Sequence, residues 1–464
     1  MTRTERDVAQ LVTPLRRIVL GIHPVRMVAM AFGIAIVIGT TLLALPVSSE
    51  DGTSAPLLTC LFTATSAICV TGLAVVDTGS YWSGFGEGVL LVLIQAGGFG
   101  IMTLASLLAL LIAGKLPLRM TLNVATETKS AGIGDVRGVL VRVALISLVI
   151  ESVTATILTL RFLLGHDQPF GSALYHGVFH GVSAFNSAGF SLRAEGLMEY
   201  AEDPWVMLPV MTAVILGAIG FPVIIELLRH RQRRRTTGLR GWSLHLKLTL
   251  VTTAALLVAG TLLTLALEWG NSGTLGPLGV AEKALGSFFH SAMARSGGFN
   301  ATDVTAMEPA TLLGTCVLMF IGGGSASTAG GIKVTTFAVL GTAILAEVRG
   351  EPAAGAFRRR LAPQVLRQAL TIALLGIGVV IASTIALLTL VDARFDVVLF
   401  EAVSAFGTVG LSAGLTPDLP AAGQLILIAL MFIGRVGPIT LASALALRER
   451  RRRYQLPEER PILG

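Results

Sequence analysis

The chain has 464 residues, of which 53% are hydrophobic and only 14% are charged, and its mean hydropathy is +0.76. Soluble domains carry about 25% charged residues on average, so this composition excludes an ordinary water-soluble protein. The net charge of +7 would suit a nucleic-acid-binding protein. Basic and acidic stretches alternate along the chain, however, which is the pattern of a multi-pass membrane protein that needs no nucleic acid.

Long apolar runs cover residues 26–46, 139–164, 244–267 and 366–391. Each is as long as the ~20 residues that a helix needs to span a bilayer. The first run is too long for the core of a signal peptide and has no small-x-small cleavage site, so we expect it to be retained. Basic residues gather before it and again at 115–142, 229–247, 349–367 and 448–453. The positive-inside rule then puts both termini in the cytoplasm, with an N-terminal segment at 1–25 and a C-terminal tail at 449–464.

The apolar and polar stretches follow one order four times. Each unit has a long apolar span, an acidic loop, a short apolar segment ending in Gly, and a second span. We name these units repeat A (26–114), repeat B (139–230), repeat C (244–348) and repeat D (366–448). The predicted fold is therefore an all-α polytopic membrane protein with eight transmembrane helices and four re-entrant half-helices around one pseudo-fourfold pore.

The four short segments also resemble one another, at residues 61–73, 179–190, 289–299 and 400–411. Each has a Phe, a Ser-Ala pair and then a Gly followed by a large apolar residue. They are too short to span a bilayer, and non-helical backbone at membrane depth must be buried or line a wet cavity. One such Gly could simply allow close helix packing. Four in register favour a pore.

A pore built this way has the chemistry to conduct a cation. The carbonyl end of each half-helix carries about half a negative charge, and four such ends would meet near the membrane centre. The extended chain that follows presents carbonyls that can replace the hydration shell of an ion. No Asp or Glu lies beside the four glycines, which favours a monovalent cation over a divalent one.

Several stretches resemble the Trk/Ktr/HKT superfamily of cation transporters, namely 63–73, 96–103, 185–192, 294–300, 321–334, 402–412 and 432–438. The length is most similar to that of KtrB-type subunits, the ion-translocating membrane subunits of Ktr potassium uptake systems. The resemblance implies that each repeat supplies one filter glycine. Four glycines accompany K⁺ uptake in this superfamily, whereas Ser in the first repeat accompanies Na⁺ preference in plant relatives. Cys69 departs from the family, in which Thr is common at this position.

The predicted filter binds K⁺ at backbone carbonyls and has no transition-metal site. Its residues are Val70, Thr71, Gly72, Asn186, Ser187, Ala188, Gly189, Arg295, Ser296, Gly297, Gly298, Thr408, Val409 and Gly410.

The second span of repeat C, at about 310–347, is interrupted by a Gly-rich run at 322–331. Glycines weaken a helix there and free backbone groups that need a cavity or pore. The resemblance implies an intramembrane gate loop, and a helix-packing interface is the alternative. Arg435 lies centrally in an apolar stretch, where a charge costs at least ~2.5 kcal/mol and indicates function. The predicted gate residues are Gly322, Gly323, Gly324, Ser325, Gly330, Gly331, Lys333 and Arg435, although Lys333 is near enough to the cytoplasmic side to snorkel.

The resemblance also implies a homodimer in the bacterial inner (plasma) membrane, gated by a cytosolic ring of KtrA-like proteins. Nucleotide is expected only on that partner, with no covalent cofactor and with Na⁺ as a candidate activator. The basic loops could dock the partner or contact anionic lipid. Alternative functions are a Na⁺-permeable or Na⁺-coupled transporter of the same fold, and a non-channel secondary transporter. The chain has no Gly-x-Ser-x-Gly elbow, so we do not expect an enzyme.

Four ionisable residues near or within the predicted spans lie outside the predicted filter and gate. His180 and His290 precede filter segments and are expected to cap or pack the half-helices. Glu401 is expected at the outer end of its half-helix, where the helix dipole favours an anion. Glu151 lies mid-span in repeat B and is expected to pair within the bundle.

Overall fold

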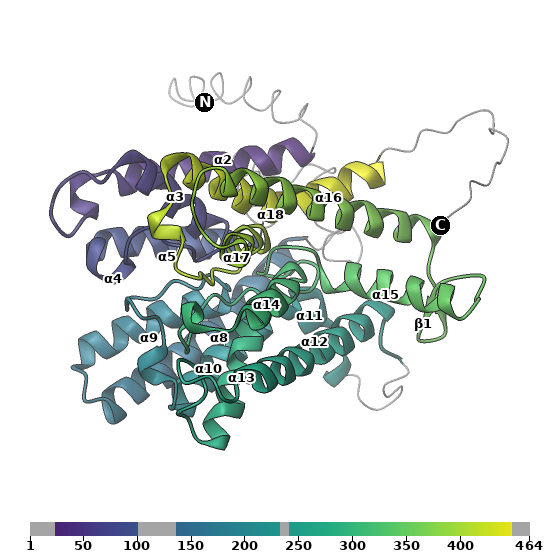
Figure 1. Ribbon diagram of the computed structural model, residues 1–464, viewed down its shortest axis with the longest axis horizontal. Helices are drawn as coiled ribbons and strands as arrows, with labels where there is room; N and C mark the ends of the chain where they lie inside the picture. The colour runs from purple at the N-terminus through teal and green to yellow at the C-terminus, as the bar shows by residue number, and fades with distance from the viewer. Residues whose placement is uncertain (1–23, 101–135, 233–240, 448–464) are drawn as a thin grey trace, which may run out of the picture.

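The computed structural model describes residues 24–100, 136–232 and 241–447 and is mostly helical (Figure 1). Most of the predicted segment 1–25, the tail 449–464 and the end of repeat A lie outside the described residues. Within the described ranges, each repeat contains a first helix, a short helix, an extended segment and one or two further helices. The division into four repeats and the re-entrant half-helices stay predictions.

The main helices follow in chain order. Repeat A contains α2 (Pro24–Leu43), α3 (Leu57–Ile68), α4 (Thr78–Tyr81) and α5 (Gly84–Gly98); repeat B contains α8 (Val136–Gly165), α9 (Phe170–Phe185), α10 (Pro204–Ile219) and α11 (Phe221–Gln232); repeat C contains α12 (Leu244–Glu268), α13 (Val280–Met293), α14 (Pro309–Phe320) and α15 (Val334–Val348); repeat D contains α16 (Pro363–Leu388), α17 (Phe395–Gly407) and α18 (Ala421–Leu447). Short 3₁₀ helices lie at Pro46–Ser48, Met198–Tyr200, Val304–Ala306 and Thr416–Asp418, and strands β1 (Gly355–Ala356) and β2 (Arg359–Arg360) pair antiparallel.

The repeats contact one another in cyclic order. Helix α5 packs on α9, α10 on α13, α14 on α17, and α18 returns to α3 and α2. Figure 1 shows this closure, because the purple helices α2 and α3 lie beside the yellow-green helix α18 although they stand at opposite ends of the chain. The short helices α3, α9, α13 and α17 are largely buried. They lie between the longer helices and position the segments that follow them.

The outer helices present large apolar side chains to the surroundings, which is how a protein meets lipid. Val92, Leu164 and Val348 are 69%, 77% and 80% exposed. Three helices are long and apolar enough to span a membrane, at Leu140–Gly165, Leu244–Glu268 and Pro363–Leu388, and a bent pair adds a fourth. The other apolar helices in the described ranges are shorter. The number of eight spans therefore stays a prediction.

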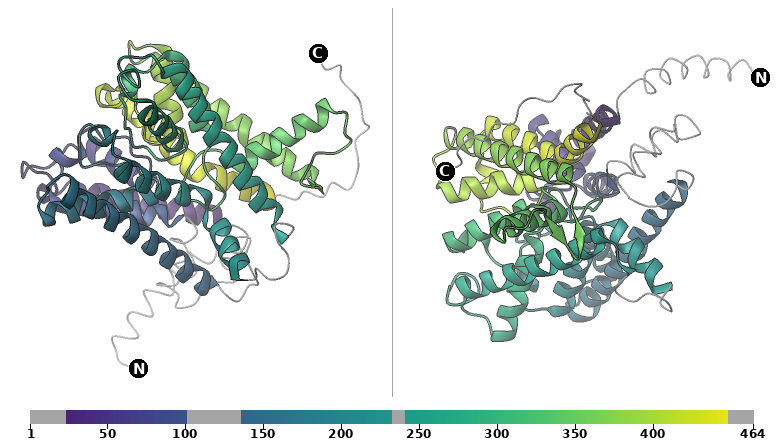
Figure 2. Two further views of the ribbon diagram at one scale, coloured as in Figure 1. Left: turned by 90° about the horizontal axis from the view of Figure 1, so that it is seen from below. Right: turned by 90° about the vertical axis from the view of Figure 1, so that its right-hand side faces the viewer.

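Two of the shorter spans are short because they are broken. Helices α10 and α11 meet at 95° around Gly220, whose φ of +97° is available to glycine at little cost. Helices α14 and α15 are separated by residues 321–333, so the interruption predicted from the Gly-rich run is confirmed. Figure 2 shows α15 and the β1–β2 hairpin projecting from the rest of the helices. The break at Gly220 was not predicted.

Candidate functional site

The short helices of repeats A, B and D end in one hydrogen-bonding pattern. In repeat A the N–H of Val70 donates to Ala67 O (3.1 Å) and the N–H of Thr71 donates to Ser66 O (2.8 Å). This pair of bonds is the Schellman motif, which needs a left-handed residue at the turn. That residue is Val70 in repeat A, and Ser187 and Thr408 are its equivalents, with φ of +56°, +60° and +47°. Residues with a Cβ pay roughly 1–2 kcal/mol for this conformation, so its recurrence indicates a shared constraint.

Two residues further on stand the four predicted filter glycines, and all have positive φ. A methyl group on Gly72 would lie 2.3 Å from Ala188 O, and one on Gly410 would lie 2.2 Å from Thr71 O. A methyl group on Gly298 would lie 2.5 Å from Val409 O, and one on Gly189 would lie 2.7 Å from the Cα of Gly298. No side chain fits at any of these four positions. The four glycines therefore form a closed ring in the order 72, 189, 298, 410.

A carbonyl oxygen from each repeat lies in this ring. The oxygens belong to the residues immediately before the glycines, namely Thr71, Ala188, Gly297 and Val409. Such a ring carries partial negative charge but no carboxylate. Carbonyl rings of this kind can substitute for water around a partly dehydrated cation.

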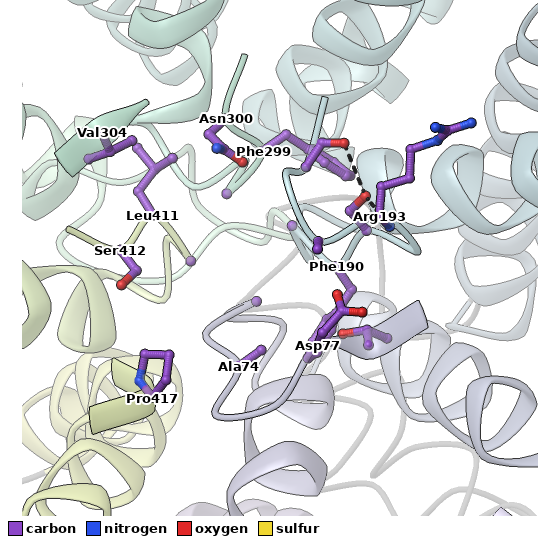
Figure 3. A pocket seen from close by; sticks show the side chains of 18 of the residues that line it. Ala74, Asp77, Phe190, Arg193, Phe299, Asn300, Val304, Leu411, Ser412 and Pro417 are labelled. Atoms are coloured by element: carbon purple, nitrogen blue, oxygen red, sulfur yellow. Dashed lines mark hydrogen bonds between the residues drawn. The ribbon is translucent and has the colours of Figure 1, made fainter. Parts of the chain in front are cut away.

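The ring glycines line a cavity of about 400 Å³. Figure 3 shows side chains from every repeat around it, among them Asp77, Arg193, Asn300 and Ser412. Asp303 also lines the cavity, so acidic and basic groups both occur on its wall. An ion reaching the carbonyl ring from this side would pass through a polar vestibule.

Two residues predicted for the filter turn their side chains away from the ring. The Asn186 amide donates to Gln95 Oε1 (2.9 Å) and Glu151 Oε1 (3.0 Å). The Arg295 guanidinium donates to Thr253 O (3.3 Å) and Gly322 O (3.2 Å). The backbones of these two residues belong to the turns, whereas their side chains bind neighbouring helices and the Gly-rich loop. Glu151 pairs within the bundle, as the sequence predicts.

Two hydroxyls of the filter segments bind neighbouring loops. Ser296 donates to Thr408 O (2.9 Å), which joins the segments of repeats C and D. Ser187 Oγ lies 2.9 Å from Thr328 Oγ1 in the Gly-rich loop. The filter segments are therefore tied to one another and to the loop.

Repeat C departs from the other three. Its Ser-Ala pair, Ser291-Ala292, lies one residue further from Gly298 than the equivalent pairs lie from their glycines. Helix α13 ends at Met293, and the N–H of Gly297 donates to Met293 O (2.7 Å). The Ser291 hydroxyl binds Leu257 O (2.9 Å) on α12. From their shared residues the four segments were expected to be equivalent, and the one-residue offset is the sequence signal that distinguishes repeat C.

The Gly-rich loop, residues 321–333, folds back on itself and forms hydrogen bonds with the break between α10 and α11 in repeat B. Gly322 N donates to Ile332 O (2.8 Å), and Val334 N donates to Gly323 O (3.0 Å). Gly324 N donates to Ala218 O (2.7 Å), and Phe221 N donates to Ala326 O (3.3 Å). Each break supplies partners for backbone groups that the other leaves free, as buried backbone requires.

Two cationic side chains, the buried Arg435 and the partly buried Lys333, donate to carbonyls of this loop. Arg435 is 5% exposed; it donates to Thr328 O and also to Gly97 O (2.7 Å) at the end of α5. Lys333 Nζ donates to Ala329 O (2.6 Å). A methyl group on Gly330 would lie 2.1 Å from Thr408 Oγ1, so the loop lies directly against the filter segment of repeat D. The predicted gate residues are thus gathered beside the ring.

The expected position of Glu401 was wrong. It lies in the middle of α17 and is completely buried, because the helix already begins at Phe395. Its carboxylate accepts from Ala413 N (2.9 Å), Ser412 Oγ (2.5 Å) and Thr416 Oγ1 (2.7 Å). It therefore anchors the segment that follows Gly410 and does not face the vestibule.

The two histidines pack within the short helices. His180 Nε2 lies 3.1 Å from Ser191 Oγ, and His290 Nε2 lies 3.0 Å from Thr315 Oγ1. His180 occupies the position equivalent to Glu401, and like Glu401 it holds the residue two places after its filter glycine. The packing role predicted for both histidines agrees with these contacts.

Comparison with known proteins identifies the family of the chain. The model of the cation transport protein family TrkH matches residues 22–451. The chain belongs to the TrkH family of cation transport proteins. The family match covers all four repeats, including the ring glycines and Arg435.

Three relatives of this TrkH-family chain have names that include potassium. The Ktr system potassium uptake protein B of Bacillus subtilis is 41% identical over 428 residues, which are 92% of this chain and 94% of the relative. The protein of the same name from Vibrio alginolyticus is 37% identical, over 95% of this chain and 94% of the relative. The potassium/sodium uptake protein NtpJ of Enterococcus hirae is 33% identical, over 97% of this chain and 99% of the relative.

A solved structure shares the fold of this TrkH-family chain. The crystal structure of the potassium transporter TrkH from Vibrio parahaemolyticus matches 89% of this chain and 84% of its own, with a TM-score of 0.67 and 18% identity. At that identity the match concerns the fold alone.

In the part of the chain that the structure describes, no three His, Cys, Asp or Glu side chains group to hold a metal ion.

Proposed function

We propose that this chain takes up potassium ions across the bacterial inner membrane and passes them through the ring of four backbone carbonyls. The ring is the observation that carries the proposal. Each repeat contributes a residue with positive φ (Val70, Ser187, Ser296 and Thr408), a glycine with no room for a side chain and one oxygen. Two of the relatives described above are named potassium uptake proteins and a third a potassium/sodium uptake protein, which supports K⁺ as the ion.

The conduction step uses the backbone. A cation entering from the vestibule exchanges water for the oxygens of Thr71, Ala188, Gly297 and Val409. The carbonyl ends of α3, α9, α13 and α17 add partial negative charge behind the ring. Because no formal charge holds the ion, a monovalent cation can bind and also leave, which conduction requires.

The Gly-rich loop and Arg435 would form the gate beside the ring. The loop is bound by hydrogen bonds rather than by a continuous helix, so it can change conformation at lower cost than α14 or α15. Arg435 is bound to a loop carbonyl and to the end of α5. Its positive charge would also repel a cation and so disfavour cation binding below the ring.

The chain would work as a homodimer with a cytosolic KtrA-like ring that binds the regulatory nucleotide. The name "Ktr system" of two relatives supports an assembly of this kind. Sodium permeation is the second candidate function, and it rests on the potassium/sodium uptake protein of Enterococcus hirae.

Complementation tests the proposal. A strain that lacks potassium uptake would express this chain with and without a KtrA-like partner, and uptake of Rb⁺ and Na⁺ would be measured. We expect growth at low K⁺ and uptake of Rb⁺ in preference to Na⁺, enhanced by the partner. Preference for Na⁺ would establish the alternative, and no uptake of either ion would contradict both.

A further inference from the structure

A buried carboxylate lies behind the ring, and the conduction step does not use it. Glu151, in the middle of α8, is 7% exposed. Its Oε1 accepts from Gln95 Nε2 (3.0 Å) and from Asn186 Nδ2 (3.0 Å). Burying an ionisable group in an apolar bundle is costly unless hydrogen bonds compensate, so a carboxylate retained here needs a reason.

The three side chains form a closed triangle between two repeats. Asn186 Nδ2 also donates to Gln95 Oε1 (2.9 Å), so each member binds both others. Gln95 lies in the last turn of α5 in repeat A, and Asn186 caps the end of α9 in repeat B. Mutually bonded groups in a water-poor interior strengthen one another and hold their elements rigidly.

The triangle is continuous with both the ring and the loop. Asn186 directly precedes Ser187, which begins the left-handed turn and contacts Thr328. Thr328 O accepts from Arg435, and Arg435 donates in turn to Gly97 O, two residues after Gln95. The contacts therefore run from Glu151 through the filter segment, the loop and Arg435 and back to Glu151.

We propose that Glu151 is a positioning residue of the cation pathway. Through Gln95 and Asn186 it fixes the filter segment of repeat B, and so keeps Ala188 O in the ring. Through the last turn of α5 it also holds Gly97 O where Arg435 binds it. This proposal rests on the proposed function, because it assigns a role within the same pathway.

Two other buried carboxylates have a different role. Glu401 accepts from the backbone N–H of Ala413, and Glu268 accepts from the backbone N–H of Glu308 (3.0 Å). Both tie down loops. Glu151 accepts from two side-chain amides instead. Moreover, the positions equivalent to Asn186 hold Cys69, Arg295 and Gly407, so this amide support belongs to repeat B.

Flux through the purified full chain in liposomes tests the proposal, with Rb⁺ and Na⁺ uptake measured on the same preparations. The variants are Glu151→Leu, Glu151→Gln, Asn186→Leu and the double variant Glu151→Leu with Asn186→Leu. The matched control is Glu87→Gln. Glu87 is also a buried carboxylate between α5 and α9 and accepts from Tyr175 Oη, but it lies in the first turn of α5, away from the ring.

Loss of the two hydrogen bonds that Glu151 accepts should lower the Rb⁺/Na⁺ uptake ratio about threefold or more in Glu151→Leu. Glu151→Gln should lower it less, because its amide oxygen still accepts. Glu87→Gln should keep the wild-type ratio. Since the triangle acts as a unit, the double variant should be no worse than the more affected single variant.

Several outcomes would overturn the proposal. An unchanged ratio in correctly folded Glu151→Leu and Glu151→Gln would do so, as would additive effects in the double variant or an equal loss in Glu87→Gln. If Glu151→Leu fails size-exclusion chromatography, Glu151→Gln and Gln95→Leu decide by the same ratio. A wild-type preference for Na⁺ would overturn potassium selectivity while the variant ratios still decide the role of Glu151. No wild-type flux of either ion would overturn both proposals.

Discussion

In repeat A the N–H of Gly72 donates to Ser66 Oγ (3.1 Å), and in repeat D the N–H of Gly410 donates to Ser404 Oγ (3.2 Å). In repeat C the corresponding serine, Ser291, binds Leu257 O on α12 instead. One more residue stands between that serine and Gly298. Both kinds of segment nevertheless deliver a carbonyl to the same ring.

The difference shows that the filter segments place equivalent carbonyl oxygens in the ring but support them by different hydrogen bonds. Repeat A holds its glycine with a local serine. In repeat C, which has the additional residue, Arg295 donates to the carbonyl oxygen of Gly322. Gly322 is the first glycine of the Gly-rich loop in the same repeat. Repeat C therefore contributes both to the ring and to the adjacent loop, and changes in repeats A and C should have different consequences.

Substitution of the ring glycines should have the largest effect, and it should be alike in repeats A and C. Gly72→Ser and Gly298→Ala each place a Cβ within 2.5 Å of a carbonyl oxygen at a positive φ. Strain of a few kcal/mol should lower Rb⁺ flux by ~10-fold or more or abolish its preference over Na⁺. Gly88→Ala is the control, because a Cβ there meets no atom within 4 Å. Wild-type flux and selectivity in Gly72→Ser would contradict the filter assignment.

Replacement of Arg295 should act on the loop and so distinguish repeat C. Arg295→Gln removes a charged hydrogen bond to Gly322 O. With the start of the loop released, basal Rb⁺ flux in liposomes without any partner protein should rise about fivefold, which corresponds to ~1 kcal/mol. Arg394→Gln, which breaks an exposed pair with Asp396, should change nothing. An unchanged basal flux in folded Arg295→Gln would contradict a role for Arg295 of repeat C in gating.

Removal of the serine hydroxyls should have a smaller effect that separates the repeats. Ser66→Ala frees the N–H of Gly72 and should lower the Rb⁺/Na⁺ uptake ratio about threefold, which corresponds to ~0.7 kcal/mol and lies in the range of one hydrogen bond. Ser291→Ala should leave that ratio unchanged and lower only the thermal stability, because its bond runs to α12. Equal effects of the two substitutions on the ratio would contradict different roles for the serines of repeats A and C.

The smallest effect is expected outside the ring, at Asp203 before α10. Burial raises the pKa of this carboxyl, but hydrogen bonds from Arg161, His166 and the N–H of Trp205 outweigh burial and leave the pKa below its ordinary value. Its stabilisation is therefore complete above the ordinary pKa of about 3.9 and is lost as pH falls through the lower folded value. The melting temperature of Asp203→Asn should lie below that of wild type at neutral pH, with the gap closing in acid. A gap that widens in acid would contradict this sign.

Much of the fold could be predicted from the sequence because hydropathy and charge act over whole segments. The alternation of apolar runs with basic and acidic loops gave the order of helices in each repeat. Glycines that recur in register marked the ring, since a missing Cβ matters wherever the backbone is crowded. The Gly-rich run marked the break between α14 and α15 for the same reason.

The rest could not be predicted because it depends on contacts between distant residues. The bend at Gly220 is stabilised by the loop from repeat C, about a hundred residues away. Asn186 and Arg295 belong to the filter turns by position, but the directions of their side chains are set by Glu151, Gln95 and Gly322. Glu401 was misplaced because helix boundaries are uncertain by a few residues from sequence alone.

The central claim is that a cation binds at the carbonyl ring, and anomalous diffraction from crystals of the full chain grown in Rb⁺ tests it most directly. We expect a peak on the axis between the carbonyl oxygens of Thr71, Ala188, Gly297 and Val409, which Na⁺ does not displace at equal concentration. A peak confined to the vestibule near Asp77 and Asp303, or no peak along the axis, would contradict it.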